Sequence, residues 1–421
     1  MITVPEALLS YADRLEEKTR KTFPALAPLA KQCYLNTIET TVKQCENGDY
    51  FVITGDIPAL WLRDSAAQLR PYMPICAESE ELCEIIKGVI RRHVFYVNHD
   101  PYSNAFNEVS HEKSHRDETD FYSPYIWERK YEVDSLCAAI YLACDYYNVT
   151  KDKSIFTDDF HKMLKTILDT FIKEQRHAEL SSYFFKRTGC KDIDTVPNGG
   201  KGNPVGYTGM TWSGFRPSDD GCRLNYLVPA NMMAVVAMKK TAEMLIDGYS
   251  DRETADRCLK LAEEIDEGIK KYAVIDNEEF GKIYAYEVDG LGNYLLMDDA
   301  NSPSLLSMPY IGYCDKNDEL YLNTRKFILS KRNPFYFEGK AAKGIGSPHT
   351  GDDTIWHISL IMQIITGTDE AEKQYCLETL SKTHAGTNFM HESFHKDNAE
   401  NYSRSWFAWA NALFAQMLGT L

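Results

Sequence analysis

Apolar side chains recur every three or four residues along most of the chain, with charged residues between them. In the segment 5–22, Leu8, Tyr11 and Leu15 share one side, and Pro5 suits the first turn of a helix. This spacing is typical of amphipathic helices. The same spacing predicts helices near residues 26–43, 64–73, 80–98, 128–147, 156–174, 227–247, 251–272, 318–331, 352–366, 370–383 and 403–418.

Short turns join many of these predicted helices, for example at 246–251 and 366–369. Helices in consecutive antiparallel pairs predict an all-α protein, built as a closed ring of helical hairpins, an α/α toroid. The chain has no linker and no low-complexity tract, so we expect residues 1–421 to form a single domain. An alternating stretch at 282–288 predicts small β-hairpins within the connections.

Five connections are long and rich in glycine, proline, tryptophan and acidic residues, at 47–61, 100–127, 188–225, 289–309 and 333–353. Long connections in a compact fold tend to be functional. If the helices close into a ring, alternate connections lie on the same rim. The pattern therefore predicts one acidic, aromatic cavity at that rim.

The charge and composition of the chain exclude some classes of binding partner. The chain has 421 residues, with 46 Lys and Arg against 62 Asp and Glu, a formal net charge of −16. This argues against a nucleic-acid backbone or an anionic membrane as the main partner. No apolar stretch approaches the roughly 20 residues that span a bilayer. Early acidic residues such as Glu6 and Asp13 leave no apolar core for a secretory signal.

The spacing of cysteines and histidines argues against disulfide bonds and a metal site. Eleven cysteines are scattered without a CxxC pair, which favours free thiols in a reducing, cytoplasmic compartment. Without CxxC or HExxH the usual zinc signatures are missing, and we expect no metal and no cofactor.

The connection at 55–65 (GDIPALWLRDS) places Asp56, Trp61 and Arg63 before a helix. Asp64 or Ser65 suits the helix cap. A wide aromatic beside paired donors and carboxylate acceptors suits a sugar, whose hydroxyls need both and whose C–H face stacks on indole. A purely structural role for this loop is the alternative.

The segment 206–220 ends in Arg216-Pro217-Ser218-Asp219-Asp220. Such an Asp-Asp pair can cap a helix or pair with arginine. A carboxyl group becomes a useful general acid only when burial or a second acid raises its pKa.

Near the end of the chain, Glu392 lies among aromatic residues before the last helix, followed by Arg404 and Trp406. His391 and His395 have the i, i+4 spacing of helical metal ligands, but no third ligand is near in sequence.

Two further loops have a similar composition. In 344–353 (GIGSPHTGDD), His349 stands close to two aspartates, which suits sugar hydroxyls as well as a capped glycine turn. In 122–134, Trp127 stands among acids where a long loop enters a helix, although a core anchor is the simpler interpretation for Tyr131.

The segments GDIPALWLRDSAAQLRPY, SGFRPSDD, IGSPHTGDD, MHESF and YSRSWFAWANALF together resemble glycoside hydrolase family 125, the exo-α-1,6-mannosidases of bacteria and fungi. The resemblance runs from about Tyr34 to the C-terminus. It implies an (α/α)6 barrel and metal-independent hydrolysis with inversion at the anomeric carbon. It also implies an α-1,6-linked manno-oligosaccharide substrate, such as a trimmed N-glycan, from which terminal mannose is released.

The resemblance also implies roles for individual residues. The acid of FRPSDD, assigned to Asp220 with Asp219 as its rival, protonates the leaving oxygen, and Glu392 activates water as the base. The implied sugar-binding residues are Asp56, Trp61, Arg63, Asp64, Trp127, Arg216, His349 and Arg404.

Two alternatives of other classes remain open from the sequence. Sugar epimerases and isomerases with histidine pairs use a similar toroid, and His391 and His395 keep that class open. A non-catalytic glycan-binding protein with aromatic platforms is the other.

Overall fold

The structure is a computed structural model that describes residues 2–110 and 117–421. Its longer helices are α1 (Glu6–Thr22), α2 (Ala27–Thr40), α3 (Leu62–Leu69), α5 (Glu80–His99), α6 (Val133–Thr150), α7 (Asp158–Glu174), α10 (Val228–Tyr249), α11 (Arg252–Tyr272), α12 (Glu319–Ile328), α13 (His357–Thr366), α14 (Glu370–Thr383) and α15 (Ala408–Thr420). Shorter helical turns are η1 (Pro24–Leu26), η2 (Arg70–Tyr72), α4 (Met73–Cys76), η3 (Lys153–Ile155), α8 (His177–Leu180), η4 (Asp192–Asp194) and α9 (Pro197–Gly200).

The strands are short and form small antiparallel sheets. They are β1 (Val42–Gln44), β2 (Tyr50–Val52), β3 (Leu60–Trp61), β4 (Ala105–Phe106), β5 (Glu118–Thr119), β6 (Ile126–Glu128), β7 (Phe185–Lys186), β8 (Tyr226–Leu227), β9 (Val274–Asn277), β10 (Gly281–Tyr284), β11 (Glu287–Val288), β12 (Tyr294–Leu295), β13 (Tyr336–Glu338), β14 (Lys343–Ile345), β15 (Thr354–Trp356), β16 (Ser393–His395) and β17 (Asn398–Tyr402). The predicted β-hairpin is confirmed, because β10 pairs with β9.

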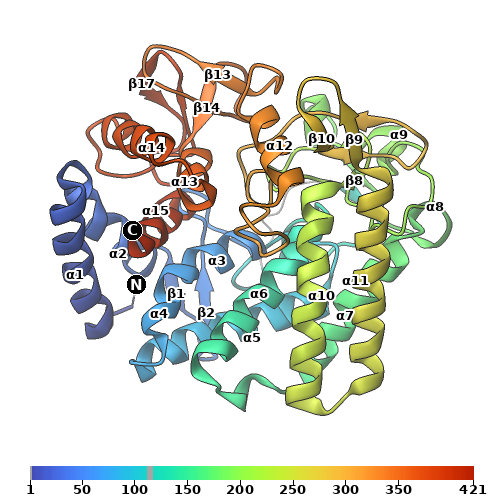
Figure 1. Cartoon of the computed structure of the whole chain (residues 1–421). Coiled ribbons are helices and arrows are strands. Elements are labelled where there is room, and N and C mark those ends of the chain that lie inside the picture. Colours follow the sequence, from blue (N-terminus) through green and yellow to red (C-terminus); the bar gives the residue numbers. More distant parts are fainter. Residues whose placement is uncertain (1, 111–116) are drawn as a thin grey trace.

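The helices form two concentric rings. In the inner ring α3 packs against α6, α6 against α10, and α15 against both α13 and α3 (Figure 1). A turn-rich segment, 298–313, which lies between α10 and α13 in sequence, packs against this ring. Its Ile311 carbonyl accepts a hydrogen bond from Tyr141 of α6, and its Tyr310 hydroxyl donates to Gln416 of α15. The helices α2, α5, α7, α11, α12 and α14 lie outside, so the predicted (α/α)6 toroid is confirmed.

Burial separates the two rings in the same way. Most residues of α6, α13 and α15 are buried on all sides of the helix, as expected for helices surrounded by protein. By contrast, α1 buries only a stripe formed by Leu8, Ala12, Leu15 and Thr19. One hydrophobic cluster joins residues from Leu8 to Leu418, although the single-domain organisation itself stays a prediction.

Three inner helices begin later than their periodicity predicts. Helix α6 begins at Val133 instead of 128, α13 at His357 instead of 352, and α15 at Ala408 instead of 403. Upstream of each, residues of the connection are extended and form strands: β6 pairs with β4 of the same connection, which also pairs with β3, and β16 pairs with both β15 and β17. Tertiary pairing between strands overrides the local helical pattern there.

This arrangement places the long connections together. Each runs from an outer helix to the start of an inner helix, so the N-terminal ends of the inner helices share one rim. The positive ends of helix dipoles converge there, which favours carboxylates at that rim.

Within the described residues no helix is both long and apolar enough to cross a membrane. All eleven cysteines are free thiols.

Candidate active site

A cavity of about 460 Å³ opens at the rim where the inner helices begin. It is lined by Thr54, Ile57, Trp61, Arg63, Asp64, Trp127, Glu128, Lys130, Arg187, Asp194, Pro217, Ser218, Asp219, Asn301, His349, Trp356, Glu392, Arg404, Phe407 and Trp409. Most of these residues come from five of the six outer-to-inner connections and from the segment 298–313; Arg63, Asp64 and Trp409 lie in the first turns of α3 and α15. Each of the five long connections predicted from the sequence contributes to this lining, so their predicted meeting at one rim is confirmed.

Two indole rings form one wall of the cavity. Trp61 ends β3 and Trp127 lies in β6, on either side of β4. Ala105 of β4 pairs with Trp61 and packs against it, while Trp127 packs on the same small cluster. A small side chain in the middle strand leaves room for two wide aromatic rings. Flat apolar walls of this kind accept the C–H face of a sugar ring.

Arg63 lies at the centre of the acidic side of the site. It lies in the first turn of α3, which begins at Leu62, so neither Asp64 nor Ser65 caps this helix as predicted. Its Nη1 atom is 2.5 Å from Glu132 Oε2 and 3.1 Å from Asp134 Oδ2. Its Nη2 atom is 3.6 Å from Asp64 Oδ2 and 3.9 Å from Asp219 Oδ1. Burial raises the pKa of Asp64 to about 6, against the opposing charge of Arg63.

The two adjacent aspartates point in different directions. Asp219 lines the cavity and has a left-handed backbone, with φ of 69°. Asp220 lies behind the wall, where its side chain is 3% exposed and its Oδ1 atom is 3.0 Å from His349 Nδ1. The turn that separates them is closed by bonds from Arg216 N–H to the Asp220 carbonyl and from Asp219 N–H to the Arg216 carbonyl. The geometry thus favours Asp219, the rival assignment, over Asp220 for direct contact with a substrate.

Arg216 does not line the cavity either. It is buried and its Nε atom is 2.6 Å from Glu287 Oε1, so it stabilises the turn that presents Asp219. The predicted contact of Arg216 with sugar gains no support from this position. The sequence could not show this, because Arg216 and its partner Glu287 are 71 positions apart in the chain.

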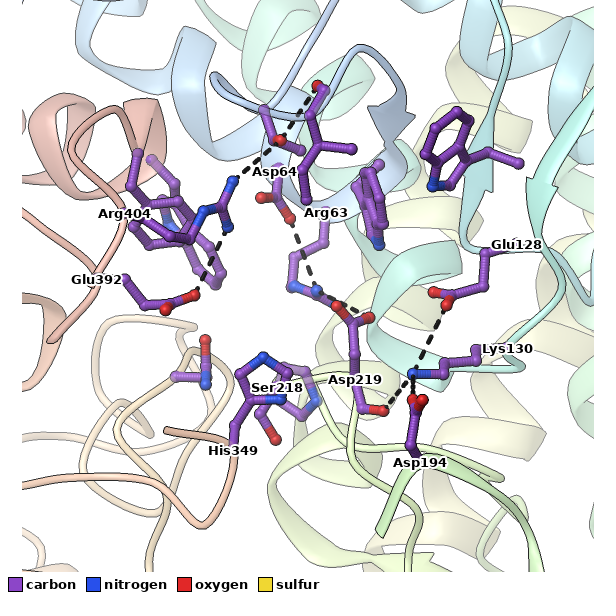
Figure 2. A pocket seen from close by; sticks show the side chains of 18 of the residues that line it. Arg63, Asp64, Glu128, Lys130, Asp194, Ser218, Asp219, His349, Glu392 and Arg404 are labelled. Atoms are coloured by element: carbon purple, nitrogen blue, oxygen red, sulfur yellow. Dashed lines mark hydrogen bonds and ion pairs between the residues drawn. The ribbon is translucent and has the colours of Figure 1, made fainter. Parts of the chain in front are cut away.

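His349 connects the acidic wall with Glu392. Burial alone would lower its pKa, but the hydrogen bond to Asp220 and the charges of Asp220, Glu392 and Asp219 raise the pKa of His349 to about 9. The imidazole is therefore a cation at neutral pH. Figure 2 shows it below the open space that separates Asp219 from Glu392.

Glu392 faces the cavity from the side opposite to Asp219 (Figure 2). Its Oε2 atom accepts a hydrogen bond from Ser403 Oγ at 2.9 Å, and its Oε1 atom lies 3.6 Å from Arg404 Nη1. Asp56 does not line the cavity but binds Arg404, with Nε 3.0 Å from its Oδ1 atom. The start and end of the chain thus meet at the site.

Gly55 makes this meeting possible. Its φ is +133°, and a Cβ there would lie 2.4 Å from the carbonyl oxygen of Trp406. Only glycine allows the chain at Asp56 to lie this close to the segment that carries Arg404.

Sequence reasoning missed several residues of the site. The main ones are Asn104, Glu128, Lys130, Glu132, Asp134, Arg187, Asp194 and Asn301. A signal was present for some, because Glu128, Lys130, Glu132 and Asp134 are charged residues at every second position. Such alternation indicates one face of an extended segment. It was hidden inside a stretch predicted to be helical.

The histidine pair has no part in the cavity. His391 is buried and stacks on Tyr402 at 3.8 Å between ring centroids, and His395 ends strand β16 instead of lying on a helix. Among the described residues no group of three or more His, Cys, Asp or Glu side chains is arranged to hold a metal ion.

An (α/α)6 ring with two carboxylates across a cavity, flanked by guanidinium groups and indole walls, is the arrangement expected of a glycoside hydrolase. The chain belongs to glycoside hydrolase family 125, the metal-independent α-mannosidases, whose pattern matches residues 24–419. The resemblance noted in the sequence is thereby confirmed, as is the assignment of the chain as an α-mannosidase.

Comparison with known proteins agrees with this family assignment. A structure from Streptococcus pneumoniae, described as a metal-independent α-mannosidase in a non-productive complex with α-1,6-mannobiose, is 44% identical. It superposes with a TM-score of 0.96 and covers 99% of this chain and 98% of that one. The meiotically up-regulated gene 157 protein of Schizosaccharomyces pombe is 39% identical, over 99% of this chain and 85% of its own length. A bacterial glucoamylase complexed with acarbose is 13% identical, with a TM-score of 0.55, over 86% of this chain and 49% of its own; it shows the shared fold alone.

Proposed function

We propose that this α-mannosidase releases terminal mannose from the non-reducing ends of α-1,6-linked manno-oligosaccharides, with inversion at the anomeric carbon. The observation that carries the proposal is the pair of carboxylates, Asp219 and Glu392, which face one cavity from opposite walls. The related streptococcal structure with α-1,6-mannobiose supports the choice of linkage.

Asp219 is the proposed general acid. It is the member of the Asp-Asp pair whose carboxylate lines the cavity, whereas Asp220 is committed to His349. As the bond between the anomeric carbon and the leaving oxygen breaks, Asp219 gives its proton to that oxygen. Asp220 then acts through His349, which it keeps charged and oriented.

Glu392 is the proposed general base. It takes a proton from a water molecule, whose oxygen attacks the anomeric carbon from the face opposite to the leaving group. The bond from Ser403 and the charge of Arg404 orient the carboxylate and leave one side open to the cavity. An inverting pair needs room for that water, with carboxyl groups roughly 6.5–9.5 Å apart.

The remaining cavity residues suit the terminal mannose. Arg63, Asp64, His349 and Arg404 present donors and acceptors for hydroxyl groups, and Trp61 and Trp127 supply apolar walls. Asp56 contributes through Arg404, which it holds by a bidentate contact.

Proton NMR of α-1,6-mannobiose hydrolysis tests the proposal, because the anomer that appears first reports stereochemistry and linkage together. We expect β-mannose first with the wild type. Asp219→Asn and Glu392→Gln should each lower turnover by at least ~100-fold. Asp220→Asn should retain much more activity than Asp219→Asn. Initial release of α-mannose, or near-normal turnover by Asp219→Asn, would contradict the proposal.

The two alternatives predict other results. A sugar epimerase would interconvert free mannose with another sugar without cleaving mannobiose, and a glycan-binding protein would bind mannobiose without releasing mannose. The positions of His391 and His395 outside the cavity lining give the epimerase no support.

We also propose a cytoplasmic location, supported by the eleven free cysteines. Cell fractionation with immunodetection tests it, and recovery of the protein mainly outside the cytoplasmic fraction would contradict it.

A further inference from the structure

The cluster around Arg63 holds more carboxyl groups than positive charges. Glu132, Asp134, Asp64 and Asp219 all lie within 3.9 Å of its guanidinium. The side chains of Glu132 and Asp134 are 0% exposed. Four ionised carboxylates on one guanidinium would bury uncompensated negative charge, which is costly. Such a cluster retains at least one proton.

The neighbouring cations relieve this excess only in part. Lys130 Nζ is 2.6 Å from Asp194 Oδ1 and 3.6 Å from Glu128 Oε1, so its charge is matched by other carboxylates. Arg187 contacts the same two carboxylates and Asp117. Together these two cations face three carboxylates of their own.

The hydrogen bonds of the Asn104 amide show which carboxyl groups share the excess negative charge. Its Nδ2 atom lies 3.2 Å from Glu128 Oε2, 3.3 Å from Glu132 Oε1 and 3.1 Å from Asp219 Oδ1. An amide nitrogen has two hydrogens for these three oxygens. The amide cannot be reversed, because its oxygen accepts the backbone N–H of Lys130 at 3.2 Å. A proton on one of the carboxyl groups resolves the shortage.

We propose that Glu132 and Asp219 hold one proton between them, and that Glu132 is a positioning residue that stores the proton which Asp219 delivers to the leaving oxygen. This inference rests on the proposed role of Asp219 as general acid. Glu132 itself is fully buried and does not line the cavity, so it acts only through Asp219.

The electrostatics place the resting proton on Glu132. Burial raises the pKa of Glu132 well above its usual range; Arg63 opposes this, and Asp219 and Asp134 add to it. Burial also raises the pKa of Asp219, but the charges of Lys130 and Arg63 outweigh it and hold this pKa at about 2. Asp219 alone would therefore have no proton to give at neutral pH, and a partner has to provide one.

In this mechanism Glu132 replaces the proton that Asp219 gives to the leaving oxygen. The bond from the anomeric carbon to the leaving oxygen breaks, that oxygen takes a proton from Asp219, and the proton on Glu132 moves to Asp219. Glu392 accepts one proton from the attacking water. After the products leave, Glu392 releases its proton to solvent and the Glu132–Asp219 pair takes one up. The net reaction consumes one water molecule.

Two substrates with different leaving groups test the inference. Glu132→Gln keeps the size of the side chain but has no transferable proton. With α-1,6-mannobiose, whose leaving alkoxide needs protonation, we expect kcat/KM to fall by ~100-fold or more. With 2,4-dinitrophenyl α-mannoside, whose leaving group departs without a proton, we expect a fall of less than ~10-fold.

Asp134→Asn is the matched control. Asp134 contacts the same Nη1 atom of Arg63 and is equally buried, yet is not part of the proton-sharing pair. We expect any loss in this variant to be equal on the two substrates. An equal loss on both substrates in Glu132→Gln as well would overturn the inference. Near-normal mannobiose hydrolysis by Asp219→Asn would instead overturn the proposed general acid.

Ser135→Ala provides a second test, should Glu132→Gln fail to fold. Ser135 Oγ donates to Glu132 Oε2 at 2.7 Å, which favours the ionised carboxylate. Losing this bond should make the pair hold its proton more tightly. The basic limb of the kcat/KM profile for mannobiose should therefore move up by roughly half a pH unit to one unit. An unmoved or lowered limb would overturn the inference.

The pH profile also reflects the other groups that face the pair. These are Arg63 and Asp64 from α3, Asp134 from α6, Glu128 and Lys130 from the segment before α6, and His349 from the connection before α13. Ser135→Ala changes none of them, so the direction of the shift reports on Glu132.

Discussion

The ion pair between Arg216 and Glu287 anchors the turn that carries Asp219, and Glu287→Ala should destabilise the protein strongly. Arg216 Nε is 2.6 Å from Glu287 Oε1, and the two side chains are 4% and 0% exposed. Removing one partner of such a buried pair costs ~3–5 kcal/mol, because the other charge stays buried without compensation. Glu287 Oε2 also accepts the backbone N–H groups of Arg223 and Leu224, at 2.8 and 3.0 Å. Both are only partly buried, so water replaces the acceptor and their contribution is at most ~1 kcal/mol each.

A loss of about 4 kcal/mol is large against the ~5–15 kcal/mol that stabilises a typical folded protein. Urea unfolding followed by circular dichroism measures it as a lowered midpoint. Glu17→Ala serves as the control, because Glu17 pairs with Lys21 on the exposed face of α1 and its loss should leave the midpoint almost unchanged. An equal midpoint shift in the two variants would refute the reasoning.

A double variant separates the pair from its surroundings. Arg216→Leu with Glu287→Leu removes both charges together, so no buried charge is left unpaired. We expect the double variant to lose less free energy of unfolding than the sum of the two single variants. A strictly additive loss would mean that the two side chains stabilise the turn independently.

Three further outcomes are expected. The pKa of His349 is raised to about 9, so its charged form stabilises the fold fully below the unfolded pKa near 6.5. This stabilisation is lost as pH rises through 9. The difference in Tm between wild type and His349→Gln should therefore shrink over that range, and a constant difference would contradict it. Gly55→Ala should destabilise by ~1–3 kcal/mol because its Cβ would meet the Trp406 carbonyl, and thermal unfolding should show a larger loss than for Gly48→Ala, where a Cβ meets nothing within 4 Å. Mannobiose hydrolysis should survive incubation with EDTA, whereas loss of activity that Ca²⁺ or Zn²⁺ restores would contradict the metal-independent mechanism.

The helices were predictable because their hydrogen bonds are local. Residues i and i+4 along one segment decide whether a helix forms, and the apolar spacing of 5–22 or 251–272 carries that information directly. Helices α1 and α11 accordingly begin and end close to the expected residues. At α6 and α13 the prediction extended too far, since pairing of β6 and β15 with distant strands was invisible in the local pattern.

The cavity was predictable only in part, for a related reason. Trp61, Arg63, His349, Glu392 and Arg404 stood out as unusual residues within loops, and all of them line the cavity. Glu132 and Asp134 looked like ordinary helix-start residues. Their importance comes from Arg63, which lies about seventy positions earlier in the chain.

By itself the sequence determined the helical order, the long connections and the motifs that identify the family. The tertiary structure decided which of two adjacent carboxylates faces the cavity, because a single left-handed residue, Asp219, sends Asp220 toward His349. It also decided that Asp56 meets Arg404 across 348 positions of the chain. Ring closure brings such residues together, and their charges then set the pKa of each acid. Periodicity reports backbone structure, whereas proton positions depend on neighbours that only packing provides.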